Sequence, residues 1–155
     1  MKEVVISIHS TQNVDNGNED SLDFVTDGVY DYDEDSRSCR LTYFETEITG
    51  LAGTRTRMFF GPDQVVIKRD GTLTSRMDFK EKQRSTFLFD TPYGSATIGM
   101  RTRKIDQQFD ANGGHAVIDY VLDLEHASFS NNRFEFTVKE QQPFLPPRER
   151  KGENA

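Results

Sequence analysis

At residues 22–32 the sequence reads LDFVTDGVYDY, and this stretch decides the fold. Its even positions carry Leu, Phe, Thr, Gly and Tyr, whereas Asp23, Asp27 and Asp31 lie on the opposite parity. Alternation with a period of two is typical of a β-strand that buries one face and exposes the other. Gly28 lies in the middle of the run, where a glycine predicts the bend or bulge that a strongly curved sheet needs. The stretch therefore favours a long, bent strand in a closed barrel.

The same alternation continues along the chain in short segments separated by turn signals. The apolar parities predict further strands near residues 4–8, 39–45, 54–60, 65–69, 73–79, 87–91, 96–102, 118–124 and 134–138. Residues 11–20 and 106–114 are predicted loops, and Asp70-Gly71 predicts a tight hairpin because both central residues of a type I′ turn take positive φ. Nine or ten short strands in sequence favour an antiparallel meander, whose edges disappear when it closes into a barrel. A two-sheet sandwich is the alternative fold.

The composition agrees with an all-β domain. There are 12 Phe and 5 Tyr, and 31 Val, Ile and Thr against only 14 Ala and Leu, which favours pleated surfaces over helices. A length of 155 residues allows one domain. We expect that domain to cover residues 1–140 and to be followed by a Pro- and charge-rich C-terminal tail at residues 141–155, which should be mobile.

The charge and the single cysteine limit the classes of function. The net charge is −7, which argues against nucleic acid as a general partner, although an acidic domain can still hold a local basic groove. Cys39 is the only cysteine, so no internal disulfide or cysteine zinc site can form, and a lone cysteine fits a reducing compartment. The sequence shows neither a signal peptide nor an apolar run long enough to span a membrane. We therefore expect a cytoplasmic protein that does not contact the membrane.

The sequence offers no recognisable catalytic residue. Nucleophilic catalysis needs a Ser, Cys or Thr beside a base that a third group orients. His9, His115 and His126 fall in no such motif, and Cys39 lies among polar residues of a predicted strand. A hydrolase that uses carboxylates at the barrel mouth has no supporting motif either. We predict a protein that is not an enzyme and has no metal or cofactor.

Polar residues at strand positions that should face the apolar interior say more about a possible site. Glu45 follows Leu41 and Tyr43, Arg69 follows Val65 and Ile67, and both lie toward the ends of predicted strands. Thr91 and Thr102 follow apolar residues in the same way. A charge in such a position must be paired or face a wet cavity, because burying it alone is costly. Glu45 and Arg69 could pair with each other, or Arg69 could bind a carboxylate or phosphate of a ligand.

Two arginine-rich segments resemble each other, at residues 54–58 and 100–104. If their strands lie side by side, they form a basic stripe that could bind an anionic partner. The simpler interpretation is an exposed face that neutralises nearby acids.

A set of motifs resembles a known family. These motifs are Leu41-Thr42-Tyr43-Phe44-Glu45, Val66-Ile67-Lys68-Arg69-Asp70-Gly71, Met77-Asp78-Phe79, Thr91-Pro92-Tyr93-Gly94, Thr102 and Ile118-Asp119-Tyr120-Val121-Leu122. In this order they resemble the YwiB-like bacterial proteins, a domain of unknown function, over roughly residues 2–140. The resemblance implies an all-β fold, a closed antiparallel calycin-like, lipocalin-type β-barrel of about eight to ten strands. It implies no reaction, substrate or catalytic residue.

Two functions remain open at this point. The first is a barrel that binds a small anionic or amphipathic molecule at its mouth without catalysis, with a lining of Tyr43, Glu45, Arg69, Thr91, Tyr93 and Thr102. In that lining Arg69 would hold the anionic group, and the tyrosines would supply apolar walls with a hydroxyl at the tip. The alternative is a protein-interaction or structural module with a filled barrel, which could form a homodimer.

Overall fold

A computed structural model describes residues 1–14, 19–124 and 127–141. Their ten strands form one antiparallel sheet in the order β6-β5-β4-β3-β2-β1-β10-β9-β8-β7. The strands are β1 Lys2–Val14, β2 Glu19–Asp33, β3 Ser38–Phe44, β4 Arg55–Phe60, β5 Val65–Asp70, β6 Ser75–Phe79, β7 Arg84–Thr91, β8 Gly94–Asp110, β9 Gly113–Leu124 and β10 Ala127–Glu140. One short 3-10 helix, η1 at Glu47–Thr49, follows β3. The all-β prediction is confirmed, and the predicted tail beyond residue 141 lies outside the described residues.

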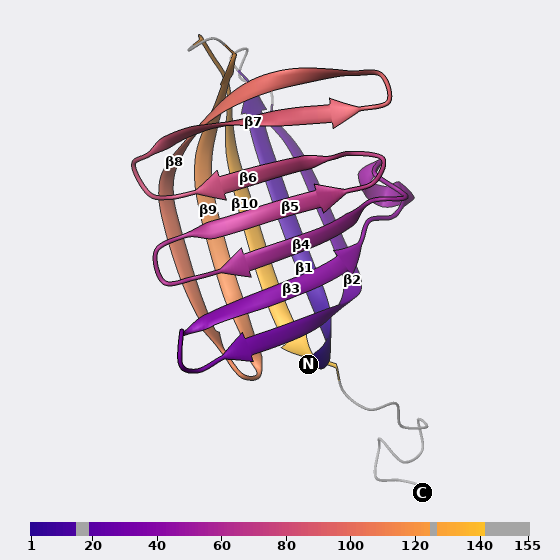
Figure 1. Cartoon of the computed structure of the whole chain (residues 1–155), viewed down its shortest axis with the longest axis vertical. Coiled ribbons are helices and arrows are strands. Elements are labelled where there is room, and N and C mark those ends of the chain that lie inside the picture. The colour runs from indigo at the N-terminus through magenta and orange to yellow at the C-terminus, as the bar shows by residue number, and fades with distance from the viewer. Residues whose placement is uncertain (15–18, 125–126, 142–155) are drawn as a thin grey trace, which may run out of the picture.

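The sheet curls into a nearly closed barrel. The long strands β1, β2, β8, β9 and β10 form one wall, and the short strands β3–β6 cross in front of them (Figure 1). The two ends of the sheet meet where Thr74 and Asp90 exchange backbone hydrogen bonds of 2.9 and 3.1 Å. This bridge and two further backbone bonds, between the β6–β7 connection and Thr102, cover edges that would otherwise be exposed.

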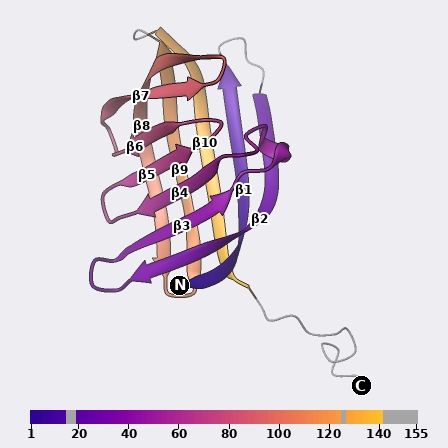
Figure 2. The ribbon, with the colours of Figure 1, turned by 45° about the vertical axis from the view of Figure 1, so that its right-hand side comes forward.

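Gly28 marks the point where β2 changes partner. Before it β2 pairs with β1, and from Val29 onward it also pairs with β3. Figure 2 shows β2 passing from the wall of long strands into the layer of short crosswise strands. A Cβ at Gly28 would lie 2.6 Å from Ile6 Cδ1 and 2.7 Å from the Thr42 carbonyl oxygen. The bend predicted from the sequence is present, and a close approach of three strands requires the glycine there.

A bulge in β8 explains why residues 106–114 are not the predicted loop. The β8–β9 register shifts between Thr102 and Lys104, so Arg103 is the extra residue. Before the bulge, the residues that face the barrel interior are at even positions, such as Thr102. After it they are at odd positions, such as Phe109. The change of parity hides the alternation, and the strand continues to Asp110. The other predicted loop, at residues 11–20, is shorter than expected because β1 extends to Val14 and β2 begins at Glu19.

The hairpin at Asp70-Gly71 has a different turn from the one predicted. The strands β5 and β6 do pair, with Arg69 opposite Ser75. Only Gly71 of the two turn residues takes positive φ, +136°, and the connection runs to Thr74. The prediction of a two-residue type I′ turn is therefore wrong. The close approach of Gly53, whose carbonyl oxygen would lie 2.1 Å from a Cβ at Gly71, shows that a neighbouring loop packs against this turn.

Aromatic side chains fill much of the barrel interior. Phe60 packs against Phe109 with tilted rings at 4.6 Å between centroids, and Phe79 contacts Tyr120 edge-on at 5.1 Å. Phe134 and Phe136 continue this cluster on β10. Such pairs add to the stabilisation from apolar burial. The remaining interior space is consequently small.

Cys39 is buried on β3, and we expect it to be unreactive in the folded protein. Burial raises the pKa of its thiol to about 11, and a hydrogen bond with Tyr30 lowers the pKa only in part. At pH of about 8 the folded protein therefore holds almost no thiolate, which is the reactive form. Alkylation of Cys39 by iodoacetamide should be at least about tenfold slower in native protein than in urea-unfolded protein. Equal alkylation rates in the two states would contradict the burial of this side chain.

Candidate functional site

An internal pocket of about 140 Å³ lies within the barrel. Its walls come from strands on both sides of the barrel and from the segment around η1. The lining consists of Ile8, Ser10, Leu22, Phe24, Tyr43, Glu45, Thr49, Leu51, Met58, Arg69, Phe134 and Phe136. Most of these side chains are apolar, so the pocket combines a hydrophobic wall with one acid and one base.

Glu45 is held in place by its neighbours on β4 and η1. Its side chain is 1 % exposed. One carboxylate oxygen, Oε1, accepts a 2.9 Å hydrogen bond from the Thr49 hydroxyl, and Oε2 accepts one from the Thr56 hydroxyl. Thr46 caps η1 by accepting from the Ile48 N–H, and the helix returns the chain so that Thr49 reaches Glu45. Two hydroxyl donors therefore stabilise a buried carboxylate.

Arg69 approaches Glu45 from β5. Its Nε lies 3.8 Å from Glu45 Oε2, an ion-pair distance that is too long for a hydrogen bond. Its Nη1 donates weakly to Met77 Sδ at 3.9 Å. Within the described part of the chain, Nε is buried without a hydrogen-bond partner. A buried donor without an acceptor costs free energy, and a ligand oxygen could satisfy it.

Two tyrosine hydroxyls near this pair remain neutral. Burial raises the pKa of Tyr43, the negative charge of Glu45 raises it further, and Arg69 offsets part of the effect. Burial likewise raises the pKa of Tyr120, and Arg69 again opposes it. Both side chains therefore keep a proton to donate at neutral pH.

The structure brings together only half of the predicted lining. Tyr43, Glu45 and Arg69 all line the pocket. Thr102 is fully buried on β8, where its hydroxyl has no partner within the described residues, and it is not part of the lining.

Thr91 and Tyr93 lie away from the pocket, in the turn between β7 and β8. The Thr91 hydroxyl donates to the Gly94 carbonyl at 3.0 Å and accepts from the Tyr93 N–H at 3.2 Å, so it stabilises its own turn. Tyr93 is 99 % exposed. These two residues are not part of this pocket's lining, because shared parity does not tell whether a strand end still faces the interior.

The sequence interpretation did not find Thr49 and Thr56, which hold Glu45. Thr56 shares parity with Met58 and Phe60, so the same search for polar residues on an apolar face would have found it. Thr49 had no such signal, because it reaches Glu45 through a 3-10 turn.

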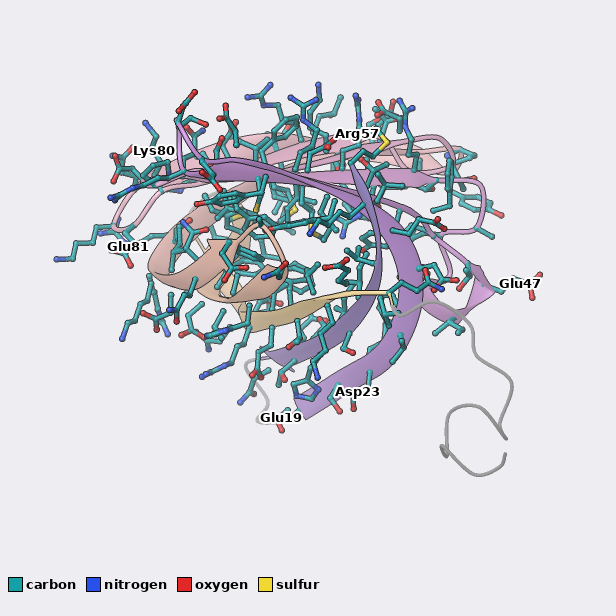
Figure 3. The ribbon with its side chains drawn as sticks, turned by 90° about the horizontal axis from the view of Figure 1, so that it is seen from below. Glu19, Asp23, Glu47, Arg57, Lys80 and Glu81 are labelled. Carbon is teal, nitrogen blue, oxygen red and sulfur yellow. The ribbon has the colours of Figure 1, made fainter. Side chains whose placement is uncertain are left out.

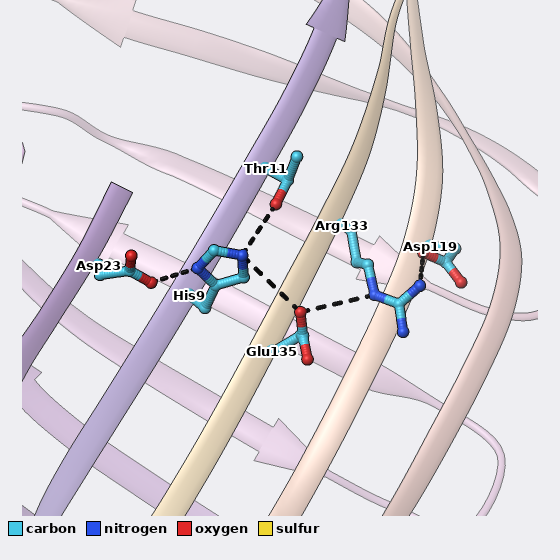
Figure 4. Close-up of polar contacts among 6 residues, drawn as sticks. All are labelled: His9, Thr11, Asp23, Asp119, Arg133 and Glu135. Carbon is cyan, nitrogen blue, oxygen red and sulfur yellow. Dashed lines mark hydrogen bonds and ion pairs between the residues drawn. The ribbon is translucent and has the colours of Figure 1, made fainter. Parts of the chain in front are cut away.

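The histidines form no catalytic group within the described residues. His9 lies on the outer face in a charge ladder with Asp23, Glu135, Arg133 and Asp119 (Figure 4). A hydrogen bond with Asp23 raises the pKa of His9 against a weaker opposing effect of desolvation. The ladder is exposed and alternates in sign, as a solvated sheet face does. His115 is exposed on β9, and His126 lies outside the described residues.

Other hollows on the surface carry less chemistry. One of them, about 530 Å³, lies between the β6–β7 connection and β8 and is lined mainly by exposed polar residues such as Asp63, Lys80 and Asp106. Among the described residues, no group of three His, Cys, Asp or Glu side chains could hold a metal ion, and no helix is long and apolar enough to cross a membrane. The internal pocket is the candidate site because it encloses buried charges.

The fold and the pocket together define a small antiparallel β-barrel with a charged internal pocket. Residues 6–136 match the domain of unknown function DUF1934, and the chain belongs to this family. It is similar to the crystal structure of the ywiB protein from Bacillus subtilis, with a TM-score of 0.79 and 18 % identity over 91 % of this chain and 93 % of that chain. At this identity the likeness supports the fold alone, and it confirms the barrel that the sequence motifs implied. No match was found among curated proteins.

Proposed function

We propose that the protein binds a small anionic or amphipathic molecule in the internal pocket and does not act on it chemically. The Nε of Arg69, which has no hydrogen-bond partner among the described residues, carries this proposal, since it offers a hydrogen bond inside a mostly apolar pocket. Glu45 already accepts from two hydroxyls and balances the charge of Arg69. A bound carboxylate or other oxygen acceptor would complete the coordination of the guanidinium.

The size of the pocket limits the ligand. Drug-sized ligands occupy roughly 300–1,000 Å³, whereas an engineered apolar cavity of about 150 Å³ holds benzene. At about 140 Å³ the pocket fits a single ring or a short branched chain. Leu22 and Leu51 at its rim are partly exposed, so a longer ligand could extend outward past them.

Titration with benzoate, toluene and benzamidine tests the proposal, because these probes share a ring and differ in charge. Benzoate should bind most tightly and should raise the Tm of the wild type by about 5–10 °C near a hundredfold excess over Kd. Arg69→Gln should bind benzoate at least about tenfold more weakly while its affinity for toluene stays the same. Leu51→Phe, which fills the rim without changing charge, should weaken all three. Equal benzoate affinity in wild type and Arg69→Gln would contradict the role of Arg69.

The alternative function is a protein-interaction or structural module with a filled barrel, which could form a homodimer. The exposed apolar side chains of the β7–β8 hairpin, Leu88, Phe89 and Tyr93, favour it as a contact surface. This alternative predicts no saturable binding of any of the three probes, so the same titration separates the two functions. For either function we propose a cytoplasmic location, which the single buried cysteine supports.

A further inference from the structure

The outer face of β3–β6 gathers positive charge on an acidic chain. We call this surface the basic face. It carries five cations and two acids, although the whole chain has a net charge of −7. Figure 3 shows nitrogen-tipped side chains standing outward along this layer, Arg57 among them. The cations are Arg40, Arg55, Arg57, Lys68 and Arg76, and the acids are Asp70 and Asp78.

Three of these cations lie directly opposite one another on neighbouring strands. Arg57 of β4 is opposite Lys68 of β5, which in turn is opposite Arg76 of β6. Like charges in this position destabilise a sheet, because opposed Cβ atoms lie only about 4.5–5.5 Å apart. Arg57 bonds to Asp70 at 2.8 Å and Arg76 to Asp78 at 3.3 Å, whereas Lys68 has no ion pair among the described residues. The ladder around His9 alternates in sign, so this chain does build the stable arrangement elsewhere.

Aromatic rings accompany the charges. Phe44 lies at the end of β3 opposite Arg55 and is 69 % exposed. Phe59 lies on the same face, partly buried, and the Arg40 guanidinium lies 4.9 Å from its ring centroid. An exposed ring beside arginine side chains is the arrangement on which unpaired bases stack.

We propose that the basic face binds single-stranded nucleic acid. The cations match the phosphates, and the rings match unstacked bases, which a duplex does not offer. Four strands spaced about 4.8 Å apart give a surface for only a few nucleotides. The acidic remainder of the chain disfavours the long contact that general duplex binding needs. The face is on the outside of the wall whose inner side lines the pocket, so this proposal does not depend on the proposed ligand.

Fluorescence anisotropy of a labelled oligouridine of about 12 nucleotides tests this on the full chain at low salt. Lys68→Glu should weaken binding by about tenfold or more and make the slope of log K against log salt shallower by about 0.7. Arg103→Glu, an exposed change of the same charge on β8, is the matched control and should shift binding less than about twofold. Phe44→Ala should weaken binding by about fivefold or more, because one stacking contact is lost.

Stability provides an independent readout. Lys68→Glu places an acid between Arg57 and Arg76, so its Tm should rise by about 1–4 °C while binding falls. Loss of binding together with a lower Tm would overturn the proposal, because the loss would then reflect damage to the fold. Equal loss in Lys68→Glu and Arg103→Glu would overturn it in favour of a net-charge effect. Equal affinity for inorganic polyphosphate, with no effect of Phe44→Ala, would overturn it in favour of general polyanion binding.

Discussion

Replacing Arg69 with methionine should destabilise the protein by about 3–5 kcal/mol, because it leaves the Glu45 carboxylate buried without its counter-charge. The Glu45 side chain is 1 % exposed, although Thr49 and Thr56 still donate to it. The reverse change, Glu45→Leu, should cost less, because the Arg69 side chain is 13 % exposed and can turn toward solvent. Urea unfolding of both variants measures this asymmetry.

The double variant Glu45→Leu with Arg69→Met completes the test. Replacing both members of a buried ion pair with apolar residues is often neutral or stabilising, so the double variant should recover most of the loss. Because the double variant should recover most of a loss of about 3–5 kcal/mol, the cycle should give a coupling free energy of about 3 kcal/mol or more. If the two single changes simply add, the 3.8 Å approach of these groups has no energetic significance. A recovered double variant that no longer distinguishes benzoate from toluene would link the pair to ligand binding as well.

The sequence predicted the central strands of the barrel better than the ends of its strands and the turns between them. Period-two alternation identified the central strands, because each buries one face against the aromatic interior. It also predicted the bend at Gly28, and it offered the pairing of Glu45 with Arg69 as one of two alternatives. These features depend on local parity, which a sequence displays directly.

What the sequence did not predict depends on contacts between distant segments. The Arg103 bulge reverses the inward parity of β8, so the alternation vanished where the strand continues. The similar arginine-rich segments lie on β4 and β8, which are not neighbours, so the condition for a shared basic stripe is not met. Arg57 of β4 instead lies opposite Lys68 of β5, which in turn lies opposite Arg76 of β6, because the strand register places them there. Register and sheet order are set by the closed barrel as a whole.

Gly28→Ala should destabilise the protein by about 2–3 kcal/mol and lower Tm by roughly 5–10 °C. The added methyl would lie 2.7 Å from the Thr42 carbonyl oxygen and 2.6 Å from Ile6 Cδ1, closer than packed atoms allow. Backbone conformation is not the cause, because Gly28 is not among the glycines with positive φ. The strain arises where β1, β2 and β3 converge.

Two comparisons separate this crowding from a general effect of losing a glycine. Gly61→Ala is the matched control, since its Cβ would meet only the Gln64 carbonyl oxygen at 3.6 Å, and it should change the free energy of unfolding by less than about 0.5 kcal/mol. Adding Ile6→Val to Gly28→Ala removes the crowded Cδ1, so the pair should be less destabilising than the sum of its parts. The Thr42 carbonyl oxygen belongs to the backbone and cannot be trimmed, so relief should stay partial. Full additivity in the cycle would show that Ile6 moves aside freely and that the corner is less tightly packed than its contacts indicate.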